Sequence, residues 1–187
     1  MNQSRKEEAA LVLDFLLNGY ASDRTPIHLK TSIAQALGTS NFTILELVPK
    51  KGIYLQPLEK VYIGEAKRDK VHHINGRIPF EKLSSTAKAE LEHAVKEILI
   101  DQEERFVEFF NKAQPLNTRM HILELLPGLG KKHMKEIVEQ RVEAPFKSFA
   151  DIKERVKLMP DPEKVVIKRI VQELQGQEKH FLFVNRQ

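Results

Sequence analysis

Apolar residues change their spacing along the chain, from mixed patterns near the N-terminus to a steady helical period later. Between Ala10 and Leu17 they recur with helical spacing, which predicts a short helix over residues 7–18 that ends at Gly19. The following residues 20–40 contain several turn formers and predict an irregular segment.

The next stretch, from Phe42 to Ile78, is rich in β-forming residues that alternate with turn residues. It predicts four short strands, at residues 42–48, 53–55, 60–64 and 72–78. Short strands joined by closely spaced turns are typical of a small antiparallel sheet or barrel. We therefore expect an OB-like β-barrel domain over residues 1–83, accompanied by the N-terminal helix.

From Ser84 onward the apolar spacing is helical. Residues 84–114 are expected to form a connecting helical segment, and residues 115–187 an all-helical domain with a C-terminal tail. The expected helices of that domain cover residues 118–126, 131–142, 149–158 and 163–175, and residues 181–184 are expected to add a strand to the sheet. The predicted fold class is therefore α+β in two domains.

Two stretches of the C-terminal region repeat each other at an offset of 33 residues. Leu126-Pro127 matches Met159-Pro160, and Ile137-Val138 matches Ile170-Val171. Each copy reads as a helix, a tight turn containing proline, and a second helix. We therefore expect a tandem pair of helical hairpins with pseudo-symmetry.

The first turn, Leu126-Pro127-Gly128-Leu129-Gly130, has the signature of a helix-hairpin-helix. Its glycines leave backbone amides uncovered at the N-terminus of the next helix, where the helix dipole is positive and binds phosphate. The candidate nucleic-acid-binding residues here are Gly128, Leu129, Gly130, Lys131, Lys132 and Lys135. In the second turn Asp161 and Glu163 would repel phosphate and could cap their own helix, so this copy is expected to be structural.

Charge and composition agree with a nucleic-acid partner. The net charge is +4, and the chain contains no cysteine, which excludes disulfides, thiolate zinc sites, iron–sulfur clusters and cysteine catalysis. Residues 115–187 hold 14 Lys and Arg against 10 Asp and Glu, and residues 50–82 hold 8 against 4. An acidic stretch, residues 83–114, separates these two basic regions.

The predicted barrel supplies a second group of candidates. Strand-binding OB folds combine a basic groove with exposed aromatic side chains. The proposed nucleic-acid-binding residues of the barrel are Lys50, Lys51, Lys67, Arg68 and Lys70, with Tyr54, Lys60, Tyr62 and Arg77 nearby in sequence. The alternative is that the tyrosines are half-buried strand residues and the cations a solvated face.

Several strings resemble a known family. They are residues 42–52, 61–64, 109–115, 118–132 and 145–152. Together they resemble a largely archaeal family of uncharacterised proteins, a domain of unknown function that joins an OB-like barrel to a C-terminal helix-hairpin-helix pair. The resemblance covers nearly the whole chain and implies this architecture, with RNA or DNA binding linked to RNA or translation. It implies no established activity.

Two other functions stay open. A protein–protein adaptor would use the helical hairpins and the acidic segment 83–114 with its phenylalanines. A glycosylase or nuclease would use Asp151 or the carboxylates of residues 101–108, although an acid near a helix start and a solvated helix face are the simpler interpretations. Adjacent His72 and His73 should point to opposite faces of a strand, so no metal site and no cofactor are expected.

No apolar run approaches the roughly 20 residues of a membrane-spanning helix, and the N-terminal apolar stretch lacks a small-residue cleavage site. We expect a cytoplasmic protein without a membrane partner. The favoured function is non-enzymatic binding of nucleic acid, RNA before DNA, through phosphate contacts that do not depend on base sequence.

Overall fold

The computed structural model describes residues 6–185. The chain divides into two compact units. The first contains the described residues up to Ala94 together with the segment from Glu173 onward, and the second spans Val95–Gln172. The domain boundaries predicted after residues 83 and 114 stay predictions.

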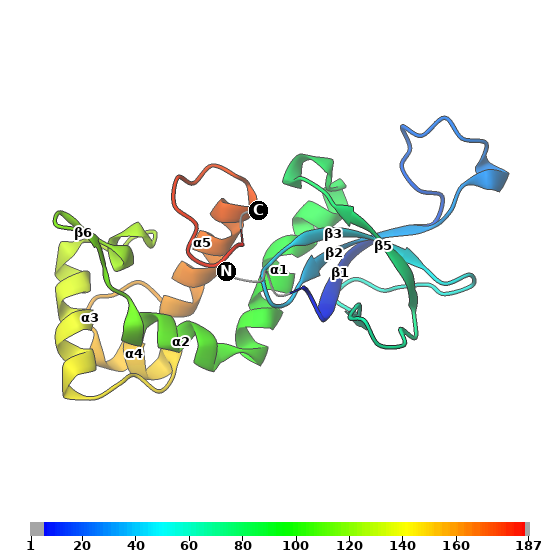
Figure 1. Ribbon diagram of the computed structural model, residues 1–187. Coiled ribbons are helices and arrows are strands. Elements are labelled where there is room, and N and C mark those ends of the chain that lie inside the picture. Colours follow the sequence, from blue (N-terminus) through cyan, green and yellow to red (C-terminus); the bar gives the residue numbers. More distant parts are fainter. Residues whose placement is uncertain (1–5, 186–187) are drawn as a thin grey trace. The chain divides into compact units, whose positions relative to one another are not determined.

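The first unit is built on a five-stranded sheet. Its strands are β1 (Ala9–Leu16), β2 (Ile33–Gly38), β3 (Ile44–Pro49), β4 (Lys60–Tyr62) and β5 (Val71–Arg77). Their order is β4-β1-β2-β3-β5, and every neighbouring pair is antiparallel. The sheet curls into a half-barrel, with β4 and β5 as its two edges, and the long β1–β2 loop extends beyond it (Figure 1).

The inner face of the half-barrel holds an apolar core. Alternate residues of β1, β2 and β3 share this face, because successive side chains of a strand point to opposite sides. The buried members of the core are Ala10, Val12, Ala34, Ala36, Leu45, Leu47, Leu55, Val61, Ile63 and Val71. This core lies inside the half-barrel, which stays open between its edge strands β4 and β5.

The opposite face of the sheet anchors the first α-helix, α1 (Ser85–Asp101). The fully buried Gln35 side chain donates to the Lys82 carbonyl at 2.9 Å and accepts from the Ser84 amide at 2.9 Å. The Ser84 hydroxyl donates to Asp14 at 2.6 Å. These bonds fix the start of α1 to β1 and β2.

The predicted N-terminal helix is wrong, because residues 9–16 form β1. Leu11 and Leu13 on one face are buried as deeply as Ala10 and Val12 on the other, so the strand lacks the polar alternation of a half-buried strand. A register shift between Val12 and Asp14 further breaks the period of two. A continuous apolar run of this kind does not distinguish a strand from a helix.

Two neighbouring predictions are also corrected. The segment 20–40, expected to be irregular, contains β2, in which every residue is buried, and a short 3-10 helix at Ile27–Leu29. Residues 53–55, expected to be a strand, belong to none. The strands predicted around residues 42–48, 60–64 and 72–78 correspond to β3, β4 and β5.

The second unit contains helices and a small hairpin. The helices within it are α2 (Glu103–Lys112), α3 (Lys131–Glu143) and α4 (Phe149–Arg155), and α5 (Pro162–Leu174) begins in it. Residues 115–121 form the two short strands β6 (Pro115–Asn117) and β7 (Met120–His121), followed by a 3-10 helix at Ile122–Leu125. The region is therefore not all-helical, and the predicted α-helix over 118–126 is wrong. The Asn117 side chain accepts from the Arg119 amide at 2.8 Å and stabilises the turn between β6 and β7, where the predicted helix would have begun.

The C-terminal tail, expected to add a strand, returns to the first unit without forming one. The Glu173 carboxylate, 1% exposed, accepts from the amides of Leu182, Phe183 and Val184 at 2.8, 3.0 and 2.9 Å. The Asn185 amide donates to the Asn41 carbonyl at 3.2 Å. A buried acid therefore positions the tail.

The α+β class and the antiparallel sheet in the N-terminal half are confirmed. Among the described residues, no helix combines the length and apolar character that crossing a membrane requires.

Candidate nucleic-acid interface

The first glycine turn has a well-defined backbone. Gly128 has a φ of +84°, a conformation that favours glycine, and Gly130 is the extended N-cap of α3. Leu129 between them is only 6% exposed, and its amide donates to the Leu126 carbonyl at 3.1 Å. The turn is thus pinned to the core by one leucine, while both glycines are exposed.

The amides at the start of α3 are uncovered. Helix hydrogen bonding begins with the Met134 amide, which donates to the Gly130 carbonyl at 3.0 Å. No side chain caps this helix, and no residue in the described part of the chain accepts from the amides of Gly130, Lys131 or Lys132. The positive end of the α3 dipole is therefore open to an anion.

Cationic side chains surround these amides. Lys131, Lys132 and Lys135 are exposed, and within residues 6–185 they make no ion pair. Uncommitted ammonium groups beside free amides provide the charge and the donors that a phosphate requires. The predicted Gly130 and lysines thus come together at the start of one helix, whereas the predicted Leu129 is buried and its amide is already bonded to the Leu126 carbonyl.

The second turn is built differently. Asp161 precedes α5, and its carboxylate accepts from the Lys164 amide at 3.3 Å and pairs with Lys153 at 3.2 Å. Burial opposes ionisation, but the bonds from Lys164 and Lys153 outweigh it and hold the pKa of Asp161 below its usual 3.8. The expected acidic cap is therefore present. The turn is also shorter, since α5 begins two residues after Pro160, whereas α3 begins four residues after Pro127.

The two turns lie against each other. A Cβ on Gly128 would stand 3.3 Å from Cγ of Pro160. His133 of α3 contacts the Leu158 carbonyl at 3.1 Å, and Glu136 accepts from the Lys157 amide at 2.8 Å. These bonds place exposed Lys157 near the start of α3, in a hollow that Lys132 also lines. Sequence analysis missed Lys157, because only the contact between the turns brings it there.

The barrel cations divide into two groups, all in the first unit. Lys50 donates to the Arg68 carbonyl, Arg68 Nε donates to the Gly64 carbonyl at 2.8 Å, and Lys70 pairs with Glu59. These three side chains hold the β4–β5 loop in shape. Lys51 and Lys67 are exposed and make no ion pair in the described chain.

The nearby tyrosines and cations show a similar division. Tyr54 is 66% exposed, with its ring 5.9 Å from that of Phe15, whereas the Tyr62 hydroxyl accepts from the Ala66 amide at 3.2 Å. Lys60 is exposed at the edge strand β4, and Arg77 is exposed on β5. The barrel candidates therefore do not form one uniform basic surface.

Three of the carboxylates considered for catalysis have structural partners. Asp151 accepts from the Lys147 amide at 2.9 Å and pairs with Arg155 at 3.3 Å. Glu103 accepts from the Phe149 amide at 2.7 Å, and Glu108 pairs with Lys112. No group of three or more metal-ligating side chains occurs among residues 6–185.

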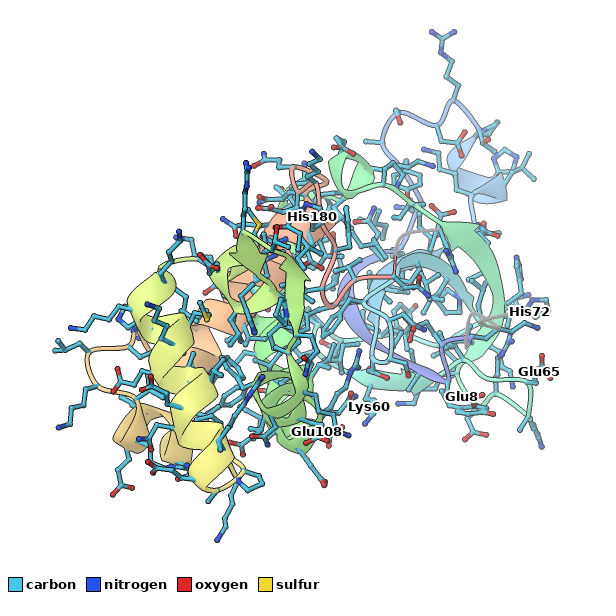
Figure 2. All side chains as sticks on the ribbon, turned by 60° about the vertical axis from the view of Figure 1, so that its left-hand side comes forward. Glu8, Lys60, Glu65, His72, Glu108 and His180 are labelled. Atoms are coloured by element: carbon cyan, nitrogen blue, oxygen red, sulfur yellow. The ribbon has the colours of Figure 1, made fainter. Side chains whose placement is uncertain are left out.

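Two further expectations are corrected by the side chains. The rings of His72 and His73 do not diverge, since their Nδ1 atoms lie 2.7 Å apart on β5, whose His72 is labelled in Figure 2. The phenylalanines considered as an adaptor surface are largely internal, because Phe106 and Phe110 are 1% and 0% exposed.

Comparison with known proteins identifies the family of this chain. Residues 6–185 match the family described as "Protein of unknown function (DUF655)". The chain belongs to the DUF655 family. A DUF655 relative from Methanocaldococcus jannaschii, named "Uncharacterized protein MJ0038", is 42% identical over 180 residues, which is 95% of this chain and 80% of the relative.

A solved DUF655 structure has a similar fold. The crystal structure of Af1531 from Archaeoglobus fulgidus matches with a TM-score of 0.89 and 43% sequence identity. The match covers 96% of this chain and all of the Af1531 chain. The fold described above is thus similar to that of an experimentally solved DUF655 member.

Proposed function

We propose that this DUF655 protein binds nucleic acid, RNA in preference to DNA, through phosphate contacts at the start of α3. The observation that carries the proposal is the uncapped N-terminus of α3, which follows a glycine turn and is flanked by Lys131, Lys132 and Lys135. The preference for RNA, and a link to translation, rest on the family resemblance alone.

In this proposal the glycine turn works as a helix-hairpin-helix. The amides of Gly130, Lys131 and Lys132 donate to phosphate oxygens, and the lysines add charge whose effect is screened by salt. Gly128 adopts the positive φ of the turn, and Leu129 anchors the turn from inside. Contacts of this kind position a backbone without reading bases, so binding is insensitive to sequence.

The second hairpin acts as a structural partner, because the Asp161 carboxylate already accepts from the Lys164 amide and places a negative charge at the start of α5. The curled sheet of the first unit is the proposed OB-like element, with Lys51 and Lys67 as its uncommitted cations. The adaptor function receives less support, because two of its three phenylalanines are buried.

Gly130→Asp is the decisive variant. Gly130 has a φ of −103°, and a Cβ there would meet nothing within 4 Å, so a side chain is accommodated. An aspartate would cap α3 as Asp161 caps α5, and would bring a negative charge to the phosphate position. We expect RNA affinity to fall by at least about tenfold, measured by fluorescence anisotropy with structured RNA, single-stranded DNA and duplex DNA.

The controls separate folding from binding. Replacing an N-cap glycine by aspartate changes helix stability by only about a few tenths of a kcal/mol, so the thermal midpoint should be unchanged or slightly higher. Gly130→Ala tests side-chain bulk without charge and should retain most of the affinity. Unchanged binding by a folded Gly130→Asp protein would remove the α3 turn from the mechanism.

A further inference from the structure

The first unit has a cavity at the open end of the half-barrel, separate from the hollow beside Lys132. The cavity has a volume of about 460 Å³ and is lined by residues after β4, such as Ile63 and Gly64, and by Ile74 and Arg77 of β5. Glu8 and Glu65, labelled in Figure 2, line the same cavity. Because β4 and β5 are the two edges of the sheet, each has a neighbouring strand on one side only. A cavity of this size accepts a small organic ligand.

The wall of the cavity is partly apolar. Leu45 and Ile63 belong to the core of the half-barrel, and Ile74 packs against that core. Leu45 and Ile63, 6% and 1% exposed, form the floor of the cavity, and the more exposed Ile74 offers a surface suited to the face of a flat ring. The edge strands beside them present backbone donors and acceptors that no further strand occupies. A ligand with an apolar face and a polar edge fits this combination.

A buried hydroxyl at the cavity has no partner. Thr43 is 8% exposed, and its Oγ1 makes no hydrogen bond within the described chain. Its backbone is fully used, since the amide donates to Glu7 at 3.2 Å and the carbonyl accepts from Gly38 at 2.8 Å. Buried hydroxyls are nearly always hydrogen-bonded in proteins, so Thr43 indicates a place where a polar ligand atom belongs.

The charged side chains of the cavity differ in how far they are engaged by other groups. Lys6 pairs with Glu65 at 2.8 Å. The Glu7 carboxylate accepts from the amides of Ser40, Asn41 and Thr43 at 2.8, 3.0 and 3.2 Å. Arg77 is exposed with no ion pair to a described residue, and Arg68 uses only its Nε, towards the Gly64 carbonyl.

Guanidinium groups bind phosphate through paired donors, which Arg77 and the terminal nitrogens of Arg68 can supply. Glu8 at the same cavity adds a negative charge, whereas that of Glu65 is balanced by Lys6. That charge favours a ligand with one phosphate over a ligand with several.

We propose that this cavity binds one unstacked nucleotide, with its base against Leu45, Ile63 and Ile74 and its phosphate at Arg68 and Arg77. The hydroxyl of Thr43 bonds to the polar edge of the base. The nucleotide comes either as a free nucleoside monophosphate or as one residue of a single strand. This site contacts a base, unlike the α3 turn, and does not depend on that turn.

The test uses the full chain with AMP, CMP, GMP and UMP, the corresponding nucleosides, and five-residue oligonucleotides as separate ligands. Calorimetry measures affinity, and the methyl NMR signals of Ile63 and Ile74 report the place of binding. We expect at least one nucleotide to bind and to shift both methyl signals. If monophosphates alone bind, the ligand of the cavity is a free nucleotide. If oligonucleotides bind more strongly, the ligand is one residue of a single strand.

Two variants test the chemistry. Thr43→Val keeps the shape and removes the unpartnered hydroxyl, so nucleotide affinity should fall by about fivefold while the thermal midpoint does not fall. Arg77→Gln should lower the affinity for nucleotides by about tenfold and leave the affinity for nucleosides unchanged. Arg24→Gln, at an exposed arginine of the first unit outside the cavity, is the matched control and should change neither.

The outcome is independent of the function proposed for α3. Gly130→Asp should leave mononucleotide binding intact, so failure at one site is distinguishable from failure at the other. Absence of any nucleotide binding at millimolar concentration would overturn the proposal. So would binding that leaves the Ile63 and Ile74 signals unchanged, or that both variants leave unaffected.

Discussion

The two helical hairpins of the second unit share a pattern but differ in how they treat the start of a helix. Ahead of α3, the turn has two glycines and leaves the helix amides open. Ahead of α5, Asp161 fills the same position with its own carboxylate. The difference shows that a helix N-terminus becomes available to an anion only where the chain does not supply an anion itself.

The leucines of the two turns differ just as clearly. Leu129 is 6% exposed and holds its turn to the core, whereas Leu158 is 84% exposed with a φ of +58°. The longer turn thus buries its leucine and presents its amides. The shorter turn exposes its leucine and is fastened to α3 through His133 and Glu136.

The largest expected effect concerns these two leucines. Leu129→Ala removes buried side-chain volume and should lower the free energy of unfolding by about 3 kcal/mol. Leu158→Ala removes an exposed side chain and should change it by no more than about 0.5 kcal/mol. Urea unfolding of both variants measures the difference. Equal effects would show that the turns are packed alike.

A smaller effect is expected from the lysines that follow each turn. Lys131→Gln with Lys132→Gln should lower nucleic-acid affinity by about tenfold and reduce the slope of log affinity against log salt by about 0.7–0.9 per lysine. Lys164→Gln with Lys168→Gln, the matched pair on α5, should change neither. Anisotropy titrations over a series of salt concentrations provide both quantities. Similar losses from the two pairs would contradict the distinction between the hairpins.

The smallest effect concerns the acidic cap itself. Asp161→Ala should destabilise the protein by about 1 kcal/mol through loss of the cap, because its exposed ion pair with Lys153 adds little. The pKa of Asp161 is lowered from 3.8, so the ionised form contributes its stability above that pH and loses it as the pH falls further.

Unfolding of wild type and variant at pH 7 and near pH 3 measures this contribution. The difference in the free energy of unfolding between wild type and Asp161→Ala should shrink in acid. Asp161→Asn, which keeps a capping oxygen, should have a stability between those of the wild type and Asp161→Ala. A difference independent of pH would show that the carboxylate charge contributes nothing.

Local sequence determined the features that depend on residue type at a fixed position. The glycines and lysines from Gly128 to Lys132 predicted an open helix start, and Asp161 predicted a cap, because each involves only neighbouring backbone groups. The β-forming residues and flanking turn residues around β3, β4 and β5 also predicted strands, because β-branched and aromatic side chains favour the extended backbone. The resemblance to an uncharacterised archaeal family is confirmed at the level of the DUF655 family.

The tertiary structure decided what depends on neighbours distant in sequence. Residues 9–16 are a strand because β2 and β4 pair with both sides of β1, and burial of both faces removed the alternation that would have revealed it. The unpartnered hydroxyl of Thr43 and the arginines at the cavity, Arg68 and Arg77, come together only when the sheet curls. The sequence alone therefore carried the chemistry of single turns, whereas packing across the sheet decided which strands form and which polar groups remain without partners.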